Sequence, residues 1–112
     1  MKTGLTTRIL PAGPAGVDEA ARRLSEGGLV AFPTETVYGL GADATNAAAI
    51  AHLYEAKGRP LFNPLISHVE GLASADRIAR FDATATTLAQ AFWPGPLTLV
   101  LPKREGGVVV FR

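Results

Sequence analysis

Glycine and proline divide this chain into short segments. The two residue types stand together at residues 11–16, 58–60 and 93–96, and glycine pairs stand at 27–28 and 106–107. Because proline and glycine interrupt both helices and strands, the regular elements between these breaks are expected to be short. No apolar run approaches the ~20 residues that a membrane-spanning helix needs. The chain is therefore expected to fold from short helices and strands, away from any membrane.

The hydrophobic pattern between the breaks predicts helices that alternate with strands. Helices are expected near residues 18–26, 47–57, 71–79 and 83–92, and strands at 29–32, 65–69, 97–101 and 108–111. This order predicts an α/β or α+β fold in which helices pack on a sheet. With 112 residues, the chain is long enough for one domain and too short for two.

Capping residues mark the ends of several predicted helices. Asp18 is expected to be the N-cap or an acidic residue of the first turn of the first helix, after a loop over residues 11–16. Asn46 and Asp82 are expected to cap the second and fourth helices, because their side chains accept hydrogen bonds from free backbone amides. Gly58 is expected to end the second helix. The buried stripes are expected to include Val17, Ala21 and Leu24 in the first helix, and Ile50, Leu53 and Tyr54 in the second.

The composition is that of a globular protein. Hydrophobic residues make up 47% and charged residues 19%, and the net charge of +1 argues against a general polyanion-coating role. The absence of cysteine excludes disulfides and thiolate metal sites, and two histidines are too few for a dedicated zinc site. Residues 1–16 lack the continuous apolar stretch of a signal peptide. These features favour a soluble, cytoplasmic protein without a protein-held metal.

The first candidate site follows the predicted strand at 29–32. Residues 33–44, PTETVYGLGADA, carry hydroxyl groups at Thr34, Thr36 and Tyr38. In open α/β sheets, ligands collect where strands end and loops diverge, and hydroxyl groups there can hold a carboxylate or an amine. The glycines of the segment allow a close approach of the backbone. The alternative is an ordinary turn, in which the threonine side chains satisfy local backbone groups.

Two cations follow the predicted end of the second helix. Lys57 and Arg59 flank Gly58, and Pro60 comes next. The helix dipole favours a cation at a helix C-terminus, which is the plainer explanation of Lys57. The glycine and the proline constrain the backbone around Arg59, and a guanidinium held in this way suits bidentate recognition of a phosphate or carboxylate. The segment is not a Walker A loop, because neither GxxxxGKS nor GxxxxGKT occurs in the chain.

Four further residues are candidates with plainer alternatives. Asn63 belongs to a turn, and His68 follows on the next predicted strand, where a lone histidine is more often a hydrogen-bonded structural residue. Arg112 is either a strand-end cation that points into the same cleft or a frayed terminal residue. Trp93 is interpreted as a core or turn anchor rather than a nucleobase stacker.

Three blocks of the sequence resemble threonylcarbamoyl-AMP synthases of the YrdC-like family in content, order and spacing. They are AFPTETVYGLGADA at 31–44, KGRPLFNPLISHV at 57–69 and WPGPLTLVLPK at 93–103. The resemblance implies the YrdC-like α/β fold, a twisted mixed sheet flanked by helices, with an open, positively charged cavity. It covers about the front half of the family's usual domain, so residues 1–112 are expected to form the N-terminal part of a single domain that is incomplete at its C-terminus.

The same resemblance implies an enzyme, a nucleotidyltransferase. Its reaction forms L-threonylcarbamoyl-adenylate and pyrophosphate from L-threonine, bicarbonate and ATP. The product supplies the machinery that transfers the threonylcarbamoyl group to an adenosine beside the anticodon of certain tRNAs. Thr36 and His68 match family positions that hold L-threonine, and Arg112 matches an arginine that meets the same substrate.

The resemblance also assigns the nucleotide site. Lys57 matches the lysine of the family's KxR motif, assigned here to the phosphates, and Arg59 and Asn63 match positions that hold ATP. In the implied mechanism, the amine of threonine attacks bicarbonate, and the carbamate oxygen then attacks the α-phosphate as pyrophosphate leaves. Lys57 and Arg59 act as catalytic cations, because together with Mg²⁺ they stabilise the charge that develops on phosphate.

The family's later Ser-Ala-Asn block is absent from the chain. The chain is therefore expected to be a fragment with little or no activity alone, and its unpaired edges and apolar faces are expected to favour self-association. Two other functions remain open. One is a non-catalytic YrdC-like module that binds double-stranded RNA or tRNA, which a net charge of +1 does not favour. The other is the carbamoyl-transfer domain of hydrogenase maturation factors, whose zinc-finger-like segments a cysteine-free chain lacks.

Overall fold

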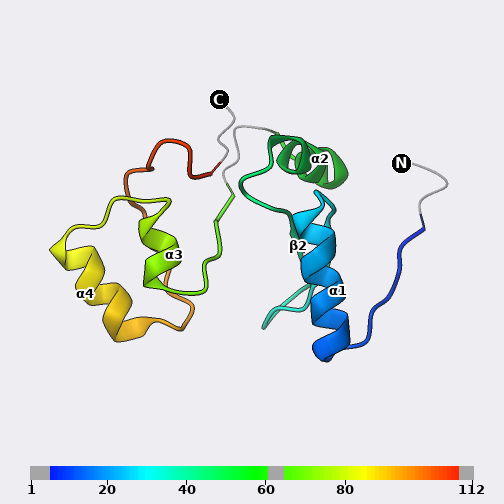
Figure 1. Ribbon diagram of the computed structural model, residues 1–112, viewed down its shortest axis with the longest axis horizontal. Helices are drawn as coiled ribbons and strands as arrows, with labels where there is room; N and C mark the ends of the chain where they lie inside the picture. The colour runs from blue at the N-terminus through cyan, green and yellow to red at the C-terminus, as the bar shows by residue number, and fades with distance from the viewer. Residues whose placement is uncertain (1–5, 61–64, 109–112) are drawn as a thin grey trace. The chain divides into compact units, whose positions relative to one another are not determined.

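A computed structural model describes residues 6–60 and 65–108 of the chain (Figure 1). Its elements are α1 (Pro14–Ser25), β1 (Val30–Phe32), β2 (Gly39–Gly41), α2 (Ala47–Lys57), α3 (Leu72–Asp76) and α4 (Ala83–Phe92). The chain divides between Asp43 and Ala44 into two compact units, each described by itself. Unit 1 contains α1, β1 and β2, and unit 2 contains α2, α3 and α4. That all of them belong to one domain stays a prediction.

Helix α1 begins four residues earlier than the sequence pattern predicts. Gly13 precedes the first turn and Pro14 opens it, where the missing amide hydrogen of proline costs nothing. Asp18 is therefore an exposed residue inside the helix, and it is neither the cap nor part of the first turn. The predicted buried face is also wrong, because Val17 is 64% exposed and Gly16 is the buried residue. A Cβ on Gly16 would lie 1.9 Å from the carbonyl oxygen of Pro11, so the segment before the helix covers this side.

Strands β1 and β2 form an antiparallel hairpin in unit 1. Phe32 pairs with Gly39 and Val30 pairs with Gly41, and α1 contacts β1. β2 lies in the segment that the sequence describes only as a polar, glycine-bearing loop, because glycine has little intrinsic strand preference. Its glycines make room for a ring. A Cβ on Gly39 would lie 3.2 Å from the Phe32 ring, and one on Gly41 would lie 2.8 Å from it.

Helix α2 confirms its prediction at both ends. The Oδ1 atom of Asn46 accepts a hydrogen bond from the amide of Ala49 at 3.0 Å, which caps the first turn. Gly58 follows the last turn with φ 64°, in the left-handed region that glycine adopts without strain. The buried stripe has the period of a helix and consists of Ala49, Ile50, Leu53 and Tyr54.

Helices α3 and α4 contact each other in unit 2 (Figure 1). Helix α4 matches its predicted range, and Asp82 caps it, since its Oδ1 atom accepts from the amide of Ala85 at 2.8 Å. Helix α3 is shorter than the predicted 71–79. Its buried residue is Ala75, and those of α4 are Ala85 and Ala89. Small side chains let two helices approach closely, but they bury little apolar area.

The strands predicted at 65–69 and 97–101 do not form in the described residues. Within the described part of unit 2, Ala79 and Lys103 instead form an isolated antiparallel bridge. Flanking it, the amide of Arg80 donates to Pro102 O at 2.8 Å, and that of Arg104 donates to Ile78 O at 2.9 Å. An alternating pattern shows that a segment can form a strand, but a strand is hydrogen-bonded only where a second strand lies beside it. The strand predicted at 108–111 falls almost wholly outside the described residues.

A search of the described residues for a helix long and apolar enough to cross a membrane finds none.

Candidate functional site

The connection between β1 and β2 is organised by Thr34. Its hydroxyl donates a hydrogen bond to the carbonyl of Val37 and accepts one from the amide of Thr36 at 3.3 Å. The hydroxyl oxygens of Thr34 and Thr36 lie 3.5 Å apart. Thr34, Thr36 and Tyr38 are all exposed, so the tip presents its hydroxyl groups to solvent. Thr34 thus satisfies local backbone groups, as the plainer interpretation of this segment expects, while Thr36 keeps an accessible hydroxyl.

The end of α2 holds Lys57 and Arg59 on either side of a left-handed turn. The amide of Gly58 donates to Glu55 O at 3.2 Å, and the amide of Arg59 donates to Tyr54 O at 3.1 Å. This pair of bonds is a Schellman motif, which satisfies carbonyls that the helix end would leave open. The backbone of Arg59 is therefore fixed by the helix that precedes it. The prediction that the glycine constrains this arginine is confirmed at the level of the backbone.

His68 lies in an extended segment of unit 2 outside any strand. It is exposed, and its Nδ1 atom lies 3.3 Å from the carbonyl oxygen of Ile66, two residues earlier. This contact is local, so it leaves the Nε2 atom of the ring for another partner. Asn63 and Arg112 lie outside the described residues, and their predicted roles stay predictions.

The predicted site residues fall into both units. Thr36 belongs to unit 1, whereas Lys57, Arg59 and His68 belong to unit 2. Within unit 2, a single helix end positions Lys57 and Arg59. The convergence of these side chains with Thr36 on one cavity stays a prediction.

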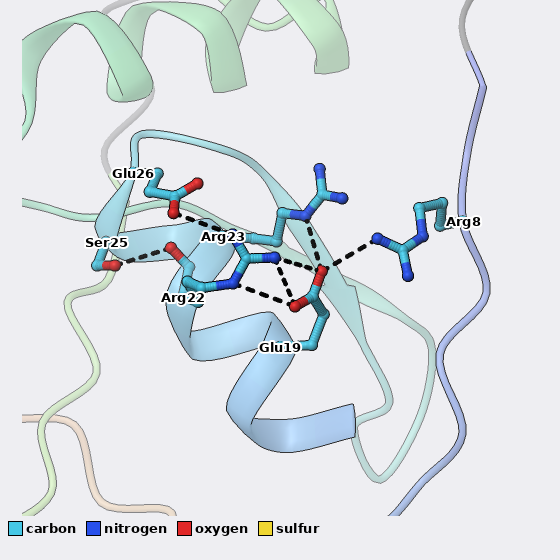
Figure 2. Close-up of polar contacts among 6 residues, drawn as sticks. All are labelled: Arg8, Glu19, Arg22, Arg23, Ser25 and Glu26. Carbon is cyan, nitrogen blue, oxygen red and sulfur yellow. Dashed lines mark hydrogen bonds and ion pairs between the residues drawn. The ribbon is translucent and has the colours of Figure 1, made fainter. Parts of the chain in front are cut away.

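A cluster of arginines around one glutamate stabilises α1 (Figure 2). Glu19 accepts from Arg22 at 2.6 Å, from Arg8 at 3.0 Å and from Arg23 at 3.3 Å, and Arg22 also reaches Glu26 at 3.0 Å. Hydrogen bonds from Arg22 and then Arg23 lower the pKa of Glu19 to about 2. The hydrogen bond to Glu19 in turn raises the pKa of Arg22. The spacing of three and four residues along a helix is the sequence signal for the pairs that Glu19 and Glu26 make within α1.

An open apolar hollow of ≈ 280 Å³ lies at the end of α4. Phe92, Pro96 and Leu97 line it, and none of the predicted site residues that the structure describes is among them. Beside it, the indole nitrogen of Trp93 donates to Leu97 O at 2.9 Å, and the ring meets Phe81 edge to face at 6.3 Å. Trp93 is therefore a turn anchor, as predicted.

The described residues contain no group of three or more His, Cys, Asp or Glu side chains placed to hold a metal ion.

Three comparisons identify related proteins. A family model labelled Sua5/YciO/YrdC and described as "Telomere recombination" matches residues 22–110. The chain is 55% identical over 87 residues to the threonylcarbamoyl-AMP synthase of Pyrococcus abyssi, over 77% of this chain and 26% of that protein. It is 52% identical over 87 residues to the Bacillus subtilis protein of the same name, over 77% of this chain and 25% of the relative. The crystal structure of P. abyssi Sua5 complexed with L-threonine matches with a TM-score of 0.76 at 49% identity, over 84% of this chain and 30% of that one.

The chain spans about a quarter of the length of these two curated relatives. Since identity and structural similarity both extend over most of this chain, the predicted α/β fold of the YrdC-like type is confirmed. The chain belongs to the Sua5/YciO/YrdC family.

Proposed function

We propose that this chain carries part of an L-threonylcarbamoyladenylate synthase. The observation that carries the proposal is its 55% identity, over 87 residues, to a protein named threonylcarbamoyl-AMP synthase. The relative solved in complex with L-threonine supports this amino acid as a substrate. The reaction would consume L-threonine, bicarbonate and ATP in the cytoplasm and supply the enzymes that transfer the threonylcarbamoyl group to tRNA.

In this proposal, the residues act by position and charge. Thr36, His68 and Arg112 hold L-threonine, so that its amine attacks bicarbonate and a carbamate forms with loss of water. A carbamate oxygen then attacks the α-phosphate of ATP, and pyrophosphate leaves. The exposed hydroxyl of Thr36 and the free ring nitrogen of His68 fit contacts to a small polar ligand.

Lys57, Arg59 and Asn63 hold ATP in the same proposal. The Schellman turn supports this role, because it fixes the backbone from which the Arg59 guanidinium extends. A fixed cation stabilises charge that develops on a phosphate more effectively than a mobile one. Mg²⁺ would enter with ATP, supplying further charge neutralisation to the phosphates.

Calorimetric titration of L-threonine, with and without ATP and Mg²⁺, tests the proposal. We expect saturable binding that nucleotide strengthens. Arg59→Ala should remove the effect of nucleotide, whereas Arg80→Ala, which removes an exposed arginine of the same unit, should not. A folded chain that binds neither L-threonine nor ATP, or an Arg59→Ala variant that keeps the full nucleotide effect, would contradict the assignment.

The arginines of α1 give RNA binding no support. The arginines of α1 are engaged by Glu19 and Glu26, which offsets most of their charge. Retention on double-stranded RNA that weakens steeply with salt, without binding of L-threonine or ATP, would favour this alternative.

A further inference from the structure

The arginine cluster on α1 shares one carboxylate oxygen among three cations. The Oε1 atom of Glu19 accepts from Nη2 of Arg22 at 2.7 Å and from Nη1 of Arg8 at 3.0 Å. The same atom accepts from Nε of Arg23 at 3.3 Å. A carboxylate oxygen has two lone pairs, so three donors compete there for two acceptor positions. The N–H groups of Arg8 and Arg23 are therefore only partly satisfied by Glu19.

Arg22 is the arginine that the two carboxylates satisfy. Its Nε and Nη2 atoms donate to Oε2 of Glu19 at 3.2 Å and 2.6 Å, and its Nη1 atom donates to Glu26 at 3.0 Å. Arg8 and Arg23, by contrast, each donate through a single nitrogen. Their other guanidinium nitrogens have no partner in the part of the chain that the structure describes. Two guanidinium groups therefore keep N–H groups for another acceptor.

The solvent-facing side of the cluster is cationic. The side chain of Glu19 is 22% exposed, whereas those of Arg8 and Arg23 are 58% and 47% exposed. The three arginines share two carboxylates, those of Glu19 and Glu26, so one positive charge is not neutralised within the cluster. Because the pKa of Glu19 is about 2, this balance holds at neutral pH. An anion that approaches from solvent meets guanidinium groups before it meets the carboxylate.

We propose that Arg8 and Arg23 bind a phosphate-type oxyanion, and that Glu19 holds their guanidinium groups together. Figure 2 shows the two groups converging on Glu19, one from the segment before α1 and the other from the helix itself. Because both groups donate to the same oxygen atom, they are close enough for one anion to contact both. A tetrahedral oxyanion suits this arrangement, since its oxygens point in several directions, whereas a single guanidinium fork already satisfies a carboxylate.

The proposed site is separate from the residues that the proposed synthase function uses. None of the residues assigned to L-threonine or ATP belongs to the cluster. Arg8 and Glu19 also precede residues 22–110, the segment that the family model matches. The failure of either proposal therefore leaves the other standing.

Titration with inorganic phosphate, followed by the arginine Nε–H signals in ¹H–¹⁵N NMR spectra, tests the inference. Sodium chloride holds the ionic strength constant, so that screening is the same at every point. We expect the signals of Arg8 and Arg23 to shift saturably with phosphate. The signal of Arg77, an exposed arginine of unit 2, should not. Shifts of Arg8 and Arg23 that stay linear, or that equal the shift of Arg77, would overturn the proposal by themselves.

Charge-removing variants test whether one anion joins the two arginines. Arg8→Gln and Arg23→Gln should each weaken phosphate affinity about fivefold, the upper end of the range for an exposed charge pair. Arg77→Gln, the matched control, should leave the affinity unchanged. The phosphate-induced shift at Arg23 should also need a higher phosphate concentration in Arg8→Gln. If Arg23 responds as in the wild type while circular dichroism shows a folded Arg8→Gln chain, the anion is not shared and the proposal is wrong.

Other anions identify the group that is recognised. Acetate should bind at least several-fold more weakly than phosphate, and acetate that binds equally well would contradict a site for a tetrahedral oxyanion. Ribose 5-phosphate separates the two sources of a phosphate group. A midpoint equal to that of inorganic phosphate would mean that the phosphate group alone is recognised, and a lower midpoint would mean that the ligand is an organic phosphate. Both of these results support the proposal.

Discussion

Replacing Gly58 by alanine isolates the energy of a single backbone conformation. Gly58 has φ 64° and ψ 28°, and a Cβ placed on it would meet no atom within 4 Å. The cost of the substitution is therefore not a clash with neighbouring groups. It comes from holding an L-residue in the left-handed region, which costs roughly 1–2 kcal/mol.

A second effect partly offsets this cost. Alanine reduces the conformational freedom of the unfolded chain, which stabilises the folded state by about 0.4–1 kcal/mol. The expected net loss is about 1 kcal/mol. Given an unfolding entropy of about 2.1 cal/mol/K per residue, this loss lowers Tm by about 4 °C if all 112 residues unfold together. The shift is about 7 °C for a cooperative unit of the size of unit 2 alone.

Urea unfolding followed by circular dichroism at 222 nm measures the effect. Gly58→Asn should cost less than Gly58→Ala, because asparagine tolerates the left-handed region. A D-alanine at position 58 should stabilise the chain, since its handedness favours positive φ. If L- and D-alanine destabilise equally, the cost is not set by φ, and the explanation from backbone conformation is wrong.

Three other perturbations have defined outcomes. Asn46→Ala and Asp82→Ala each remove a side chain that caps a helix, and each should cost about 1 kcal/mol in urea unfolding, while replacement by serine should cost much less. Equal losses with alanine and serine would exclude capping as the cause. The carboxyl of Glu19 should titrate at about pH 2 in a ¹³C NMR experiment, and Arg22→Gln should return its pKa towards 4.5. Because the folded pKa is the lower one, the stabilisation is complete above about pH 4.5 and is lost as the pH falls towards 2, whereas a midpoint near 4.5 in wild type would refute the pairing. Gly16→Ala should destabilise α1 although alanine favours helices, since its Cβ would lie 1.9 Å from a backbone carbonyl oxygen, and a higher helix content by circular dichroism would count against that packing.

Features that depend on a few neighbouring residues were predictable from the sequence. The caps Asn46 and Asp82 bond to amides three residues later, and Gly58 closes the turn that precedes it. Each of these signals acts within one helical turn, so a local pattern contains all the information needed. The bounds of α2 and α4 follow from the same signals.

Features that depend on contacts outside the predicted element were not predictable. The face of α1 is set by Pro11, which covers Gly16, so the exposed position of Val17 does not follow from periodicity. The segment 97–101 has the composition of a strand but no ladder partner in the described part of the chain.

The candidate site also combines features that neighbouring residues predict with features that depend on the fold. The local role of Thr34 is predictable because its hydroxyl group bonds to a carbonyl only three residues later. The constraint on the backbone of Arg59 follows from the preceding Gly58. The ion pair between Arg8 and Glu19 joins residues eleven apart, and no spacing rule predicts it. Only the fold can bring Thr36 and His68 together, because more than thirty residues separate them.

The indole of Trp93 gives one part of this chain an optical signal that the other part lacks. It is the sole tryptophan of the sequence, and it is fixed by its bond to Leu97 O and its contact with Phe81. Emission excited at 295 nm therefore reports the environment of Trp93 in unit 2. Fluorescence and far-ultraviolet transitions that coincide would mean that the two units melt together, and separate transitions would assign the tryptophan-silent one to unit 1.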